Sequence, residues 1–345
     1  AAGEIHSLFA NPAGGVAAFG GNDHGQLGDN TMPDDQWSPV PALGLEDVLG
    51  VAAGGYHSLT VGSSVRAWGW NSFGQIGDDS TIERSTFVTV EVLNVVSALA
   101  GGVEHSLALL LDGTVYAWGK NDHGQLGDDT NVEKWIPSEV PGLADIIAIA
   151  CGDNHSLAVK SDGTVLAWGE NSQGQLGNDN QMDQWKPVPV LGLTNIIAVS
   201  AGNQWSLALD SFGNVWSWGC GDDYRLGDGT KKDKLTPVPV QNLTDIIAIS
   251  SGGGHGLALK SDRTVWSWGL NNNGQLGVGT TLIKKTATHI TELTGIVEIS
   301  GGGYHSLAMA SDGTVYAWGG NDHGQLGQGT NVESLSPIEV IFPNT

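Results

Sequence analysis

Basic residues are scarce in this chain, and their scarcity excludes several classes of partner. The 345 residues include 14 Lys and Arg against 37 Asp and Glu, which gives a formal net charge of -23. A field of that sign repels nucleic acid and anionic lipid surfaces. We therefore expect no nucleic-acid partner. The acidity itself favours solubility, or attraction of a basic protein or a cation.

Cysteines and long apolar runs are also nearly absent. Cys151 and Cys220 lie in different repeats and at different repeat positions, so we expect two unpaired thiols. No apolar run approaches the roughly 18 residues of a membrane-crossing helix. The longest are short stretches such as Ile146 to Ala150. We expect no membrane span.

The start of the chain leaves its location open. It opens on Ala1-Ala2-Gly3 without a methionine. That start fits a mature product after removal of a signal peptide, which would be extracellular or on the cell surface. It also fits a trimmed fragment, which is compatible with a cytoplasmic protein.

A repeat runs through the whole chain. The segment Tyr116 to Gly127 returns almost unchanged at Tyr316 to Gly327. A Trp-Gly pair recurs every 50 residues, and Phe19 takes the place of the tryptophan 49 residues before the first pair. The tryptophans are Trp68, Trp118, Trp168, Trp218, Trp268 and Trp318. A fixed period of this size indicates stacked supersecondary units. Seven copies account for residues 1–345, which we interpret as a single domain.

Each repeat predicts four strands. In the copy over residues 143–190, the β-branched run Ile146 to Ala150 indicates an innermost strand buried on both faces. His155 to Lys160 and Val165 to Trp168 follow as the second and third strands, joined by a tight turn. Pro187 to Val190 is placed outermost, because an edge strand tolerates proline. The tryptophan of the third strand is large enough to fill the wedge between neighbouring sheets.

Four-stranded antiparallel units bury both faces when they are arranged radially. The predicted fold class is therefore all-β, a seven-bladed β-propeller with blades of about 50 residues. Helical repeats are excluded by 52 glycines and by the absence of a helical apolar period. The first repeat lacks most of its inner strand, because Ala1 to Ser7 aligns with Ala52 to Ser58. Either upstream residues or the tail Ile338 to Thr345 would complete the ring.

The recurring string AG..HSLAL..DGTVYAWG.N..GQLG..T......P..V, as in Ala150 to Val190 and Ser300 to Val340, resembles the regulator of chromosome condensation repeat. The resemblance covers the whole chain and implies a seven-bladed propeller. It also implies several functions: nucleotide exchange on a small GTPase at chromatin, ultraviolet sensing in plants, inhibition of β-lactamases and general protein docking. The chain lacks the basic surface that the chromatin-bound exchange factors need. It also lacks the Trp-Arg-His-Thr strings of the plant ultraviolet sensors. The inhibitors have shorter repeats without its long Gly-Gln-Leu-Gly connection.

The histidines do not predict a metal site. Equivalent positions on separate blades stand too far apart to share a metal ion. Six histidines occupy one repeat position, where we expect a hydrogen bond that ties the turn after the inner strand; they are His6, His57, His105, His155, His255 and His305. His24, His123 and His323 are expected to be solvent-exposed loop residues. Asp78-Asp79 and Asp128-Asp129 lack the spacing of a calcium loop, which leaves weak surface binding at most.

No catalytic motif is present either. The chain has no Gly-x-Ser-x-Gly elbow, no phosphate-binding Gly-x-x-x-x-Gly-Lys loop and no His-Glu-x-x-His pair. We therefore expect no catalytic residue, no cofactor and no enzymatic activity.

The turns after strands one and three of each blade emerge on one face, and this face varies most between repeats. Repeat five departs furthest: Trp205 replaces the histidine, and Cys220 to Arg225 replaces the usual x-Asn-x-x-Gly-Gln. Variation with exposed Tyr and Trp predicts a protein-binding surface, although sequence drift explains the variation as well. The candidate partner-binding residues are Glu4, Tyr56, Glu104, Asp153, Asn154, Gln204, Trp205, Asp222, Asp223, Tyr224, Arg225 and Tyr304.

The leading functional hypothesis is a non-enzymatic protein-binding scaffold that uses this face, with a partner of unknown identity. One alternative is a guanine-nucleotide exchange or regulatory factor for a small GTPase. Another is a structural subunit of an extracellular assembly, which would self-associate. Trp37, Trp135 and Trp185 precede the outer strand in three repeats, where they cover the blade rim or form a patch for self-association.

Overall fold

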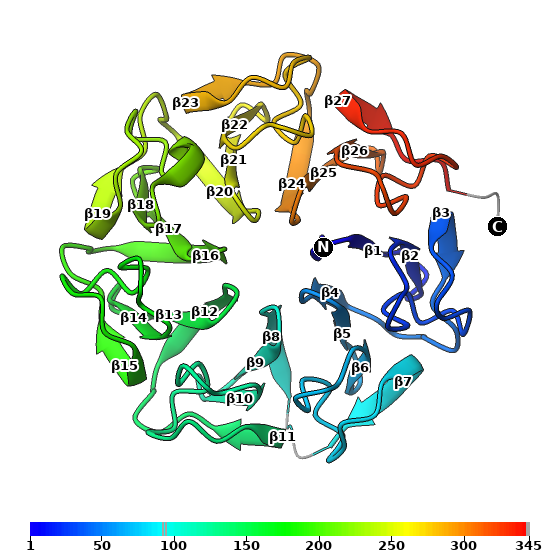
Figure 1. Ribbon diagram of the computed structural model, residues 1–345, viewed down its shortest axis with the longest axis horizontal. Helices are drawn as coiled ribbons and strands as arrows, with labels where there is room; N and C mark the ends of the chain where they lie inside the picture. The colour runs from blue at the N-terminus through cyan, green and yellow to red at the C-terminus, as the bar shows by residue number, and fades with distance from the viewer. Residues whose placement is uncertain (92, 94, 343–345) are drawn as a thin grey trace.

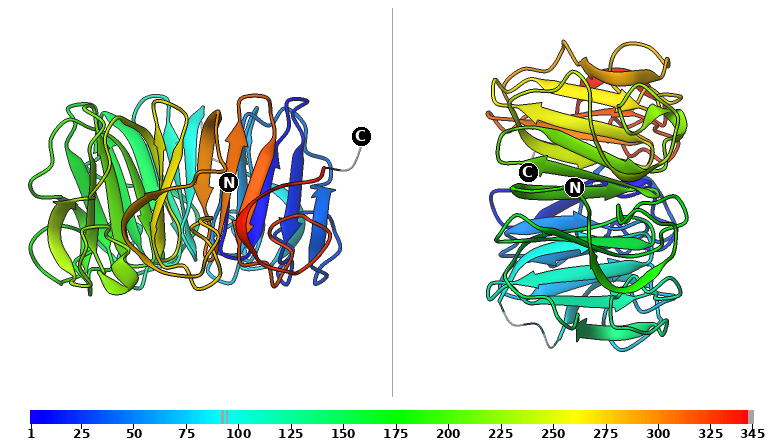
Figure 2. Two further views of the ribbon diagram at one scale, coloured as in Figure 1. Left: turned by 90° about the horizontal axis from the view of Figure 1, so that it is seen from above. Right: turned by 90° about the vertical axis from the view of Figure 1, so that its left-hand side faces the viewer.

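The computed structural model describes residues 1–91, 93 and 95–342. Seven antiparallel sheets stand around a central axis (Figure 1), and the two side views show them packed face to face in a short cylinder (Figure 2). The predicted all-β, seven-bladed propeller is therefore confirmed. Among the described residues the one helical element is the single-turn 3-10 helix η1 (Asp222–Tyr224), and no helix there has the length and apolarity that crossing a membrane requires.

The strands follow the order of the chain from the axis outward. Blades one to three contain β1 (His6–Ala10), β2 (Val16–Gly20) and β3 (Gln36–Pro41); β4 (Gly50–Ala53), β5 (His57–Val61), β6 (Val65–Gly69) and β7 (Arg84–Val90); and β8 (Val96–Gly101), β9 (His105–Leu110), β10 (Val115–Gly119) and β11 (Lys134–Glu139). Blades four and five contain β12 (Ile146–Cys151), β13 (His155–Lys160), β14 (Val165–Gly169) and β15 (Gln184–Pro189); and β16 (Ile196–Gly202), β17 (Trp205–Asp210), β18 (Val215–Gly219) and β19 (Lys234–Pro239). Blades six and seven contain β20 (Ile246–Ser251), β21 (His255–Lys260), β22 (Val265–Gly269) and β23 (Lys284–His289); and β24 (Ile296–Gly301), β25 (His305–Ala310), β26 (Val315–Gly319) and β27 (Ser334–Glu339).

Blade one has three strands, and the others have four. In place of an inner strand, Ala2 forms a single bridge to Ser7. The described part of the tail adds no strand there, because Ile338 pairs with Ala317 inside blade seven. The tail contacts blade one through side chains: the Phe342 ring lies 5.0 Å from that of Phe9, and Val340 packs in the same cluster as Phe19. Residues 343–345 of the predicted closing segment lie outside the described residues.

The inner strands are less buried than the sequence predicts. In β12, Ile147 is 50% exposed, and the pairing with β13 shifts in register between Ile146 and Ala148. The shift leaves Ile147 outside the ladder and turned toward solvent. The prediction of a strand buried on both faces is therefore wrong, because a bulge opens its first residues.

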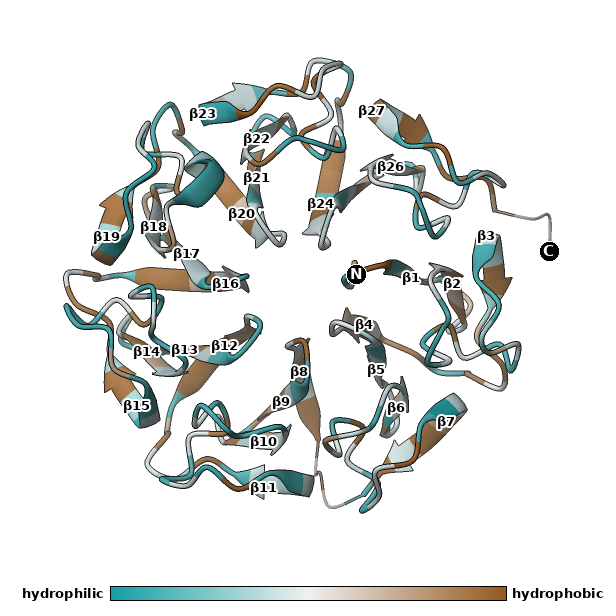
Figure 3. Ribbon diagram, in the orientation of Figure 1, coloured by the Kyte–Doolittle hydropathy of each residue, from teal (hydrophilic) through white to brown (hydrophobic). Residues whose placement is uncertain are grey.

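The indoles of the third strands lie between blades, as predicted. Trp168 of β14 is 0% exposed and packs against Leu107, Leu109 and Val115 of the preceding blade. Its Nε1 donates a hydrogen bond to the carbonyl oxygen of Gln125, 2.9 Å away. A buried indole with a bonded N–H contributes apolar area without an unsatisfied donor. In Figure 3 the inner strands such as β12, β20 and β24 are mainly hydrophobic, whereas most loops and the outer strand β23 are mainly hydrophilic or neutral.

Candidate protein-binding face

The six repeated histidines join one blade to the next. His57 Nε2 lies 2.9 Å from Ser106 Oγ of the following blade, and that hydroxyl donates to the carbonyl oxygen of Gln75. Because the Ser106 hydroxyl proton is used in that second bond, the His57 imidazole is the donor in the bond between His57 and Ser106. The prediction that these side chains tie their own turn is wrong, because the partner is a serine across the seam. The other pairs are His6–Ser58, His105–Ser156, His155–Ser206, His255–Ser306 and His305–Ser7.

Burial keeps these imidazoles neutral. Loss of solvent lowers the pKa of His57 and His155 to about 4. It lowers the pKa of the other four to about 3. No group of three or more metal-ligating side chains occurs within the described ranges. We call the six histidine–serine pairs across the seams the histidine belt.

The turns after strands one and three lie together, and we call the surface they form the varied face. The Trp70 amide donates to the Tyr56 carbonyl oxygen at 2.8 Å, which joins the two turns of blade two. On the opposite face, Asp112 Oδ1 accepts a hydrogen bond from the Thr114 amide, and the same contact recurs in blades four, six and seven. Four of the seven blades therefore share one turn there, whereas the turns after the inner strands present different side chains, such as Glu4, Tyr56 and Asp153.

An aromatic cluster stands on the varied face over blades one and two. The ring centroids of Tyr56 and Trp70 are 5.7 Å apart, and His24 stacks on Trp70 at 5.3 Å. Phe73 contacts the other side of Trp70 at 5.9 Å. All four side chains are half-buried. Tyr56 was among the predicted residues, whereas Trp70 was missed; the signal for it was an aromatic directly after the repeated Trp-Gly pair.

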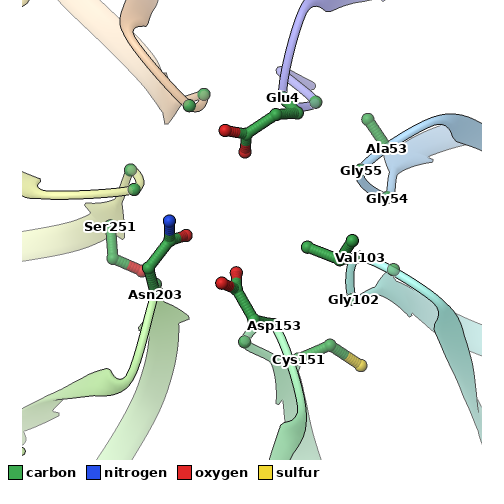
Figure 4. A pocket seen from close by; sticks show the side chains of 18 of the residues that line it. Glu4, Ala53, Gly54, Gly55, Gly102, Val103, Cys151, Asp153, Asn203 and Ser251 are labelled. Carbon is green, nitrogen blue, oxygen red and sulfur yellow. The ribbon is translucent and has the colours of Figure 1, made fainter.

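The central opening of the varied face contains acidic side chains with few basic neighbours. Glu4, Asp153 and Asn203 point into the pocket at the axis (Figure 4). Burial, followed by the charges of Glu4 and Glu170, raises the pKa of Asp153 to about 7. Burial also raises the pKa of Glu4. The opening therefore presents carboxyl groups whose ionised form lacks sufficient counter-charge.

Three other predicted residues contact neighbours on this face. Glu104 accepts a hydrogen bond from Lys120 Nζ at 2.6 Å. Asn154 and Gln204 both donate to the carboxylate of Glu170, at 3.3 and 2.8 Å. These contacts lie on blades three, four and five. Tyr304, farther round the axis, is 46% exposed.

Trp205 is not a surface residue. It is 0% exposed, and its Nε1 donates to the Gly253 carbonyl oxygen at 3.1 Å. The residue occupies the histidine position of the belt, and in the next blade Gly256 stands where other blades have serine. The predicted exposure is therefore wrong, because the repeat position buries whatever side chain it holds. Trp205 closes the seam between blades five and six.

The blade-five loop remains at the surface. Its residues Asp222–Tyr224 form η1, where Asp222 is exposed and Asp223 and Tyr224 are half-buried. The Tyr224 ring lies 5.2 Å from Nζ of both Lys231 and Lys285. Arg225 reaches toward the axis and donates to the Asn203 carbonyl oxygen at 3.1 Å. This loop joins the rim of the varied face to its centre.

The remaining candidates have structural surroundings. His24, His123 and His323 are about one-third exposed, and each Nδ1 lies 2.8–2.9 Å from a carboxylate of the next blade, so they are less solvent-exposed than predicted. Cys151 and Cys220 are free thiols. The rim tryptophans Trp37, Trp135 and Trp185 are each 44% exposed.

Fold and surface together define a β-propeller with one varied face. A family model described as the RCC1-like domain matches residues 1–190 and 90–344. The chain therefore belongs to the RCC1-like domain family.

Similarity to curated proteins is local. The chain is 34% identical over 124 residues to the guanine nucleotide exchange factor SRM1 of Saccharomyces cerevisiae, a match that covers 33% of this chain and 26% of that protein. It is 37% identical over 114 residues to human Alsin, which covers 31% of this chain and 7% of that one. Human HERC6, a probable E3 ubiquitin-protein ligase, is 35% identical over 119 residues, or 32% of this chain and 12% of that one. The matches span at most about a quarter of these relatives.

Solved structures share the whole fold. Human WBSCR16 superposes with a TM-score of 0.85 at 22% identity, covering 95% of this chain and 94% of that one. Yeast RCC1 (Prp20), solved with Kap60 bound, gives 0.85 at 21% identity, covering 98% of this chain and 84% of that one. At these identities the likeness establishes the fold alone.

Proposed function

We propose that this protein is a non-enzymatic docking scaffold whose varied face binds another protein. The observation that carries the proposal is the aromatic cluster of Tyr56, Trp70, His24 and Phe73. Its neighbouring ring centroids are 5.3–5.9 Å apart. Half-exposed aromatics held in place by neighbours are typical anchors of protein interfaces, because they bury large area at low entropic cost.

The acidic opening supports the same proposal. The charges of Glu4, Asp23 and Asp153 all act on Tyr56, raising its pKa after the larger effect of burial. An aromatic surface beside carboxyl groups suits a partner that presents apolar side chains together with Lys or Arg.

The test compares capture of partner proteins by the immobilised wild type with capture by Tyr56→Ala and Trp70→Ala variants. Trp185→Ala serves as the control, because this tryptophan is 44% exposed and lies on the rim against the Gly124 loop of blade three, away from the cluster. Bound proteins are quantified by mass spectrometry. We expect a set of proteins that both cluster variants lose and the control retains. Equal capture by all four proteins would contradict the assignment of this face.

The second candidate is regulation of nucleotide exchange on a small GTPase. It is favoured by the similarity to SRM1, whose name states that activity. The measurement is release of labelled GDP from a panel of small GTPases with and without the protein. Accelerated release that Trp70→Ala abolishes would place exchange at the varied face, whereas no acceleration across the panel would exclude it for those GTPases.

A further inference from the structure

Tyr224 occupies a position that the other six blades give to glycine. The equivalent glycines have φ between 78° and 82°, and Tyr224 has φ 58°; they are Gly25, Gly74, Gly124, Gly174, Gly274 and Gly324. A left-handed backbone is unfavourable for a bulky residue, because Cβ crowds the following carbonyl oxygen. Only one of the seven blades has this strained backbone at the position. The strain indicates that the Tyr224 side chain has a function.

Tyr224 is matched by a second departure in the facing blade. At Gly74, a Cβ would lie 2.7 Å from Cα of Trp135, so a side chain has no room there. The residue equivalent to Trp135 in blade six is Lys285. In blade five the loop forms η1, visible as the coil beside β18 in Figure 1, and the Tyr224 ring lies against Lys285 Nζ at 5.2 Å.

The surroundings of Tyr224 are basic on a strongly acidic molecule. Six of the 14 Lys and Arg residues lie on this loop and the facing edge of blade six: Arg225, Lys231, Lys232, Lys234, Lys284 and Lys285. Lys232 also replaces an aliphatic residue that is 58–68% exposed in five other blades, namely Ile82, Val132, Met182, Leu282 and Val332. The blade-five loop therefore carries a positive charge where the loops of those five blades carry an exposed apolar side chain.

Nearby carboxylates neutralise only part of this charge. Asp223 lies 3.8 Å from Arg225 and 3.9 Å from Lys231, and Asp228 lies 3.1 Å from Lys234. Lys232 and Lys285 are exposed and form no ion pair with any carboxylate in the described part of the chain. Their ammonium groups are therefore available to a ligand.

We propose that Tyr224, Lys231, Lys232 and Lys285 form a docking site for an acidic peptide segment. The ammonium groups pair with Asp or Glu carboxylates of the segment, and the tyrosine ring positions Lys231 and Lys285, whose Nζ atoms both lie 5.2 Å from its centroid. The net charge of -23 does not prevent this contact, because charges farther than about 8 Å away are screened at physiological ionic strength. This inference rests on the proposed function, since it assigns a partner chemistry to one sector of the varied face.

The test is fluorescence anisotropy with a labelled oligo-glutamate peptide at physiological ionic strength. We expect the wild type to bind it, and both Tyr224→Gly and the double variant Lys231→Gln/Lys285→Gln to bind about tenfold more weakly, the effect of losing roughly 1.4 kcal/mol. Lys186→Gln is the matched control, because Lys186 is an exposed lysine 2.8 Å from Asp129 on another blade. Its affinity should equal that of the wild type. Circular dichroism of each variant verifies folding.

Two results would overturn the site: no binding of the oligo-glutamate peptide by the wild type, or equal affinity for it in the wild type and Tyr224→Gly. A phosphoserine peptide that binds where the glutamate peptide does not would overturn the carboxylate assignment. The aromatic cluster is tested separately, because Trp70→Ala should leave peptide affinity unchanged. Failure of this site and failure of the proposed function therefore give different patterns.

Discussion

At the scale of single residues, one indole at each of six seams carries much of the packing. Trp118 is 0% exposed, packs against Leu59 and Val65 of the preceding blade, and donates to the Gln75 carbonyl oxygen at 2.8 Å. Its removal leaves a cavity between two sheets that cannot close without moving a whole blade.

We predict that Trp118→Ala lowers the free energy of unfolding by about 3–5 kcal/mol. The control is Trp135→Ala, which removes a side chain that is 44% exposed and should cost much less. Chemical denaturation of the two variants beside the wild type measures the difference. An equal decrease in the free energy of unfolding in both variants would mean that the Trp118 indole does not act as a wedge between blades.

Tyr224 gives the opposite effect on stability. Tyr224→Gly restores the residue of the other six blades and removes a left-handed conformation from a bulky side chain, so the variant should be more stable by about 1 kcal/mol. The converse change, Gly124→Ala, should destabilise, because a Cβ there would lie 2.7 Å from Cα of Trp185. Thermal unfolding monitors both. A lower melting temperature for Tyr224→Gly would show that its contacts with the lysines outweigh the strain.

The sequence predicts these residues unevenly. The wedge tryptophans were predictable, because a large aromatic at a fixed strand position has only the space between sheets to fill. Trp205 was assigned wrongly to the surface, because an unusual side chain was taken as an exposed one, although its repeat position is buried. Trp70 was missed because its role depends on contacts with Tyr56 and His24, which come from two different blades.

At the scale of elements, the histidine belt links second strands of adjacent blades. Each imidazole donates across a seam, and the accepting serine donates to a carbonyl oxygen of the loop in the first blade. The sequence indicates a shared role for the six histidines. It does not reveal the serine partner, because which repeats face each other is fixed only when the ring forms.

The belt predicts loss of stability in acid. The unfolded chain protonates these histidines near pH 6.5, whereas burial holds their pKa in the fold at about 3 to 4. The unfolded state therefore binds more protons below pH 6.5, and stability falls as pH falls from 6.5 toward 4. Each histidine contributes up to about 1.4 kcal/mol per pH unit in that window.

Denaturation curves across this window measure the number of protons taken up on unfolding. The six histidines should take up as many as six protons at its acid end, offset by about one that Asp153 releases because its pKa is about 7 in the fold. The net number should fall by one in a folded His57→Gln variant. A flat stability profile between pH 6.5 and 4.5 would contradict burial of the imidazoles in their neutral form.

At the scale of the whole molecule, the ring closes unevenly. The seam between blades seven and one keeps the belt, since His305 Nε2 lies 2.9 Å from Ser7 Oγ, but Phe19 replaces the wedge indole. Blade one also lacks an inner strand. The repeat pattern alone predicted seven blades and the missing inner strand of blade one. The path of the tail could not be predicted from the repeat, because it is known only from the strand pairings of the folded chain.

We predict that this seam opens first. Hydrogen–deuterium exchange should be faster at the C-terminal end of β1 than in β9 or β13. Residues 1–3 bond to the inner edge of β1 only at His6 and Leu8, whereas the other two strands lie between longer paired strands. Mass spectrometry of peptides from the three strands makes the comparison within one sample. Equal protection of β1 and β13 would show that the three-stranded blade is as stable as a complete one.

The assignment of partner binding to the varied face is the basis of the proposed function. The direct test is hydrogen–deuterium exchange of the protein with and without a captured partner. Our account predicts slower exchange in the varied-face turns at residues 54–56, 70–73 and 222–225. Slower exchange confined to the opposite turns, at residues 112–114 and 162–164, would contradict it.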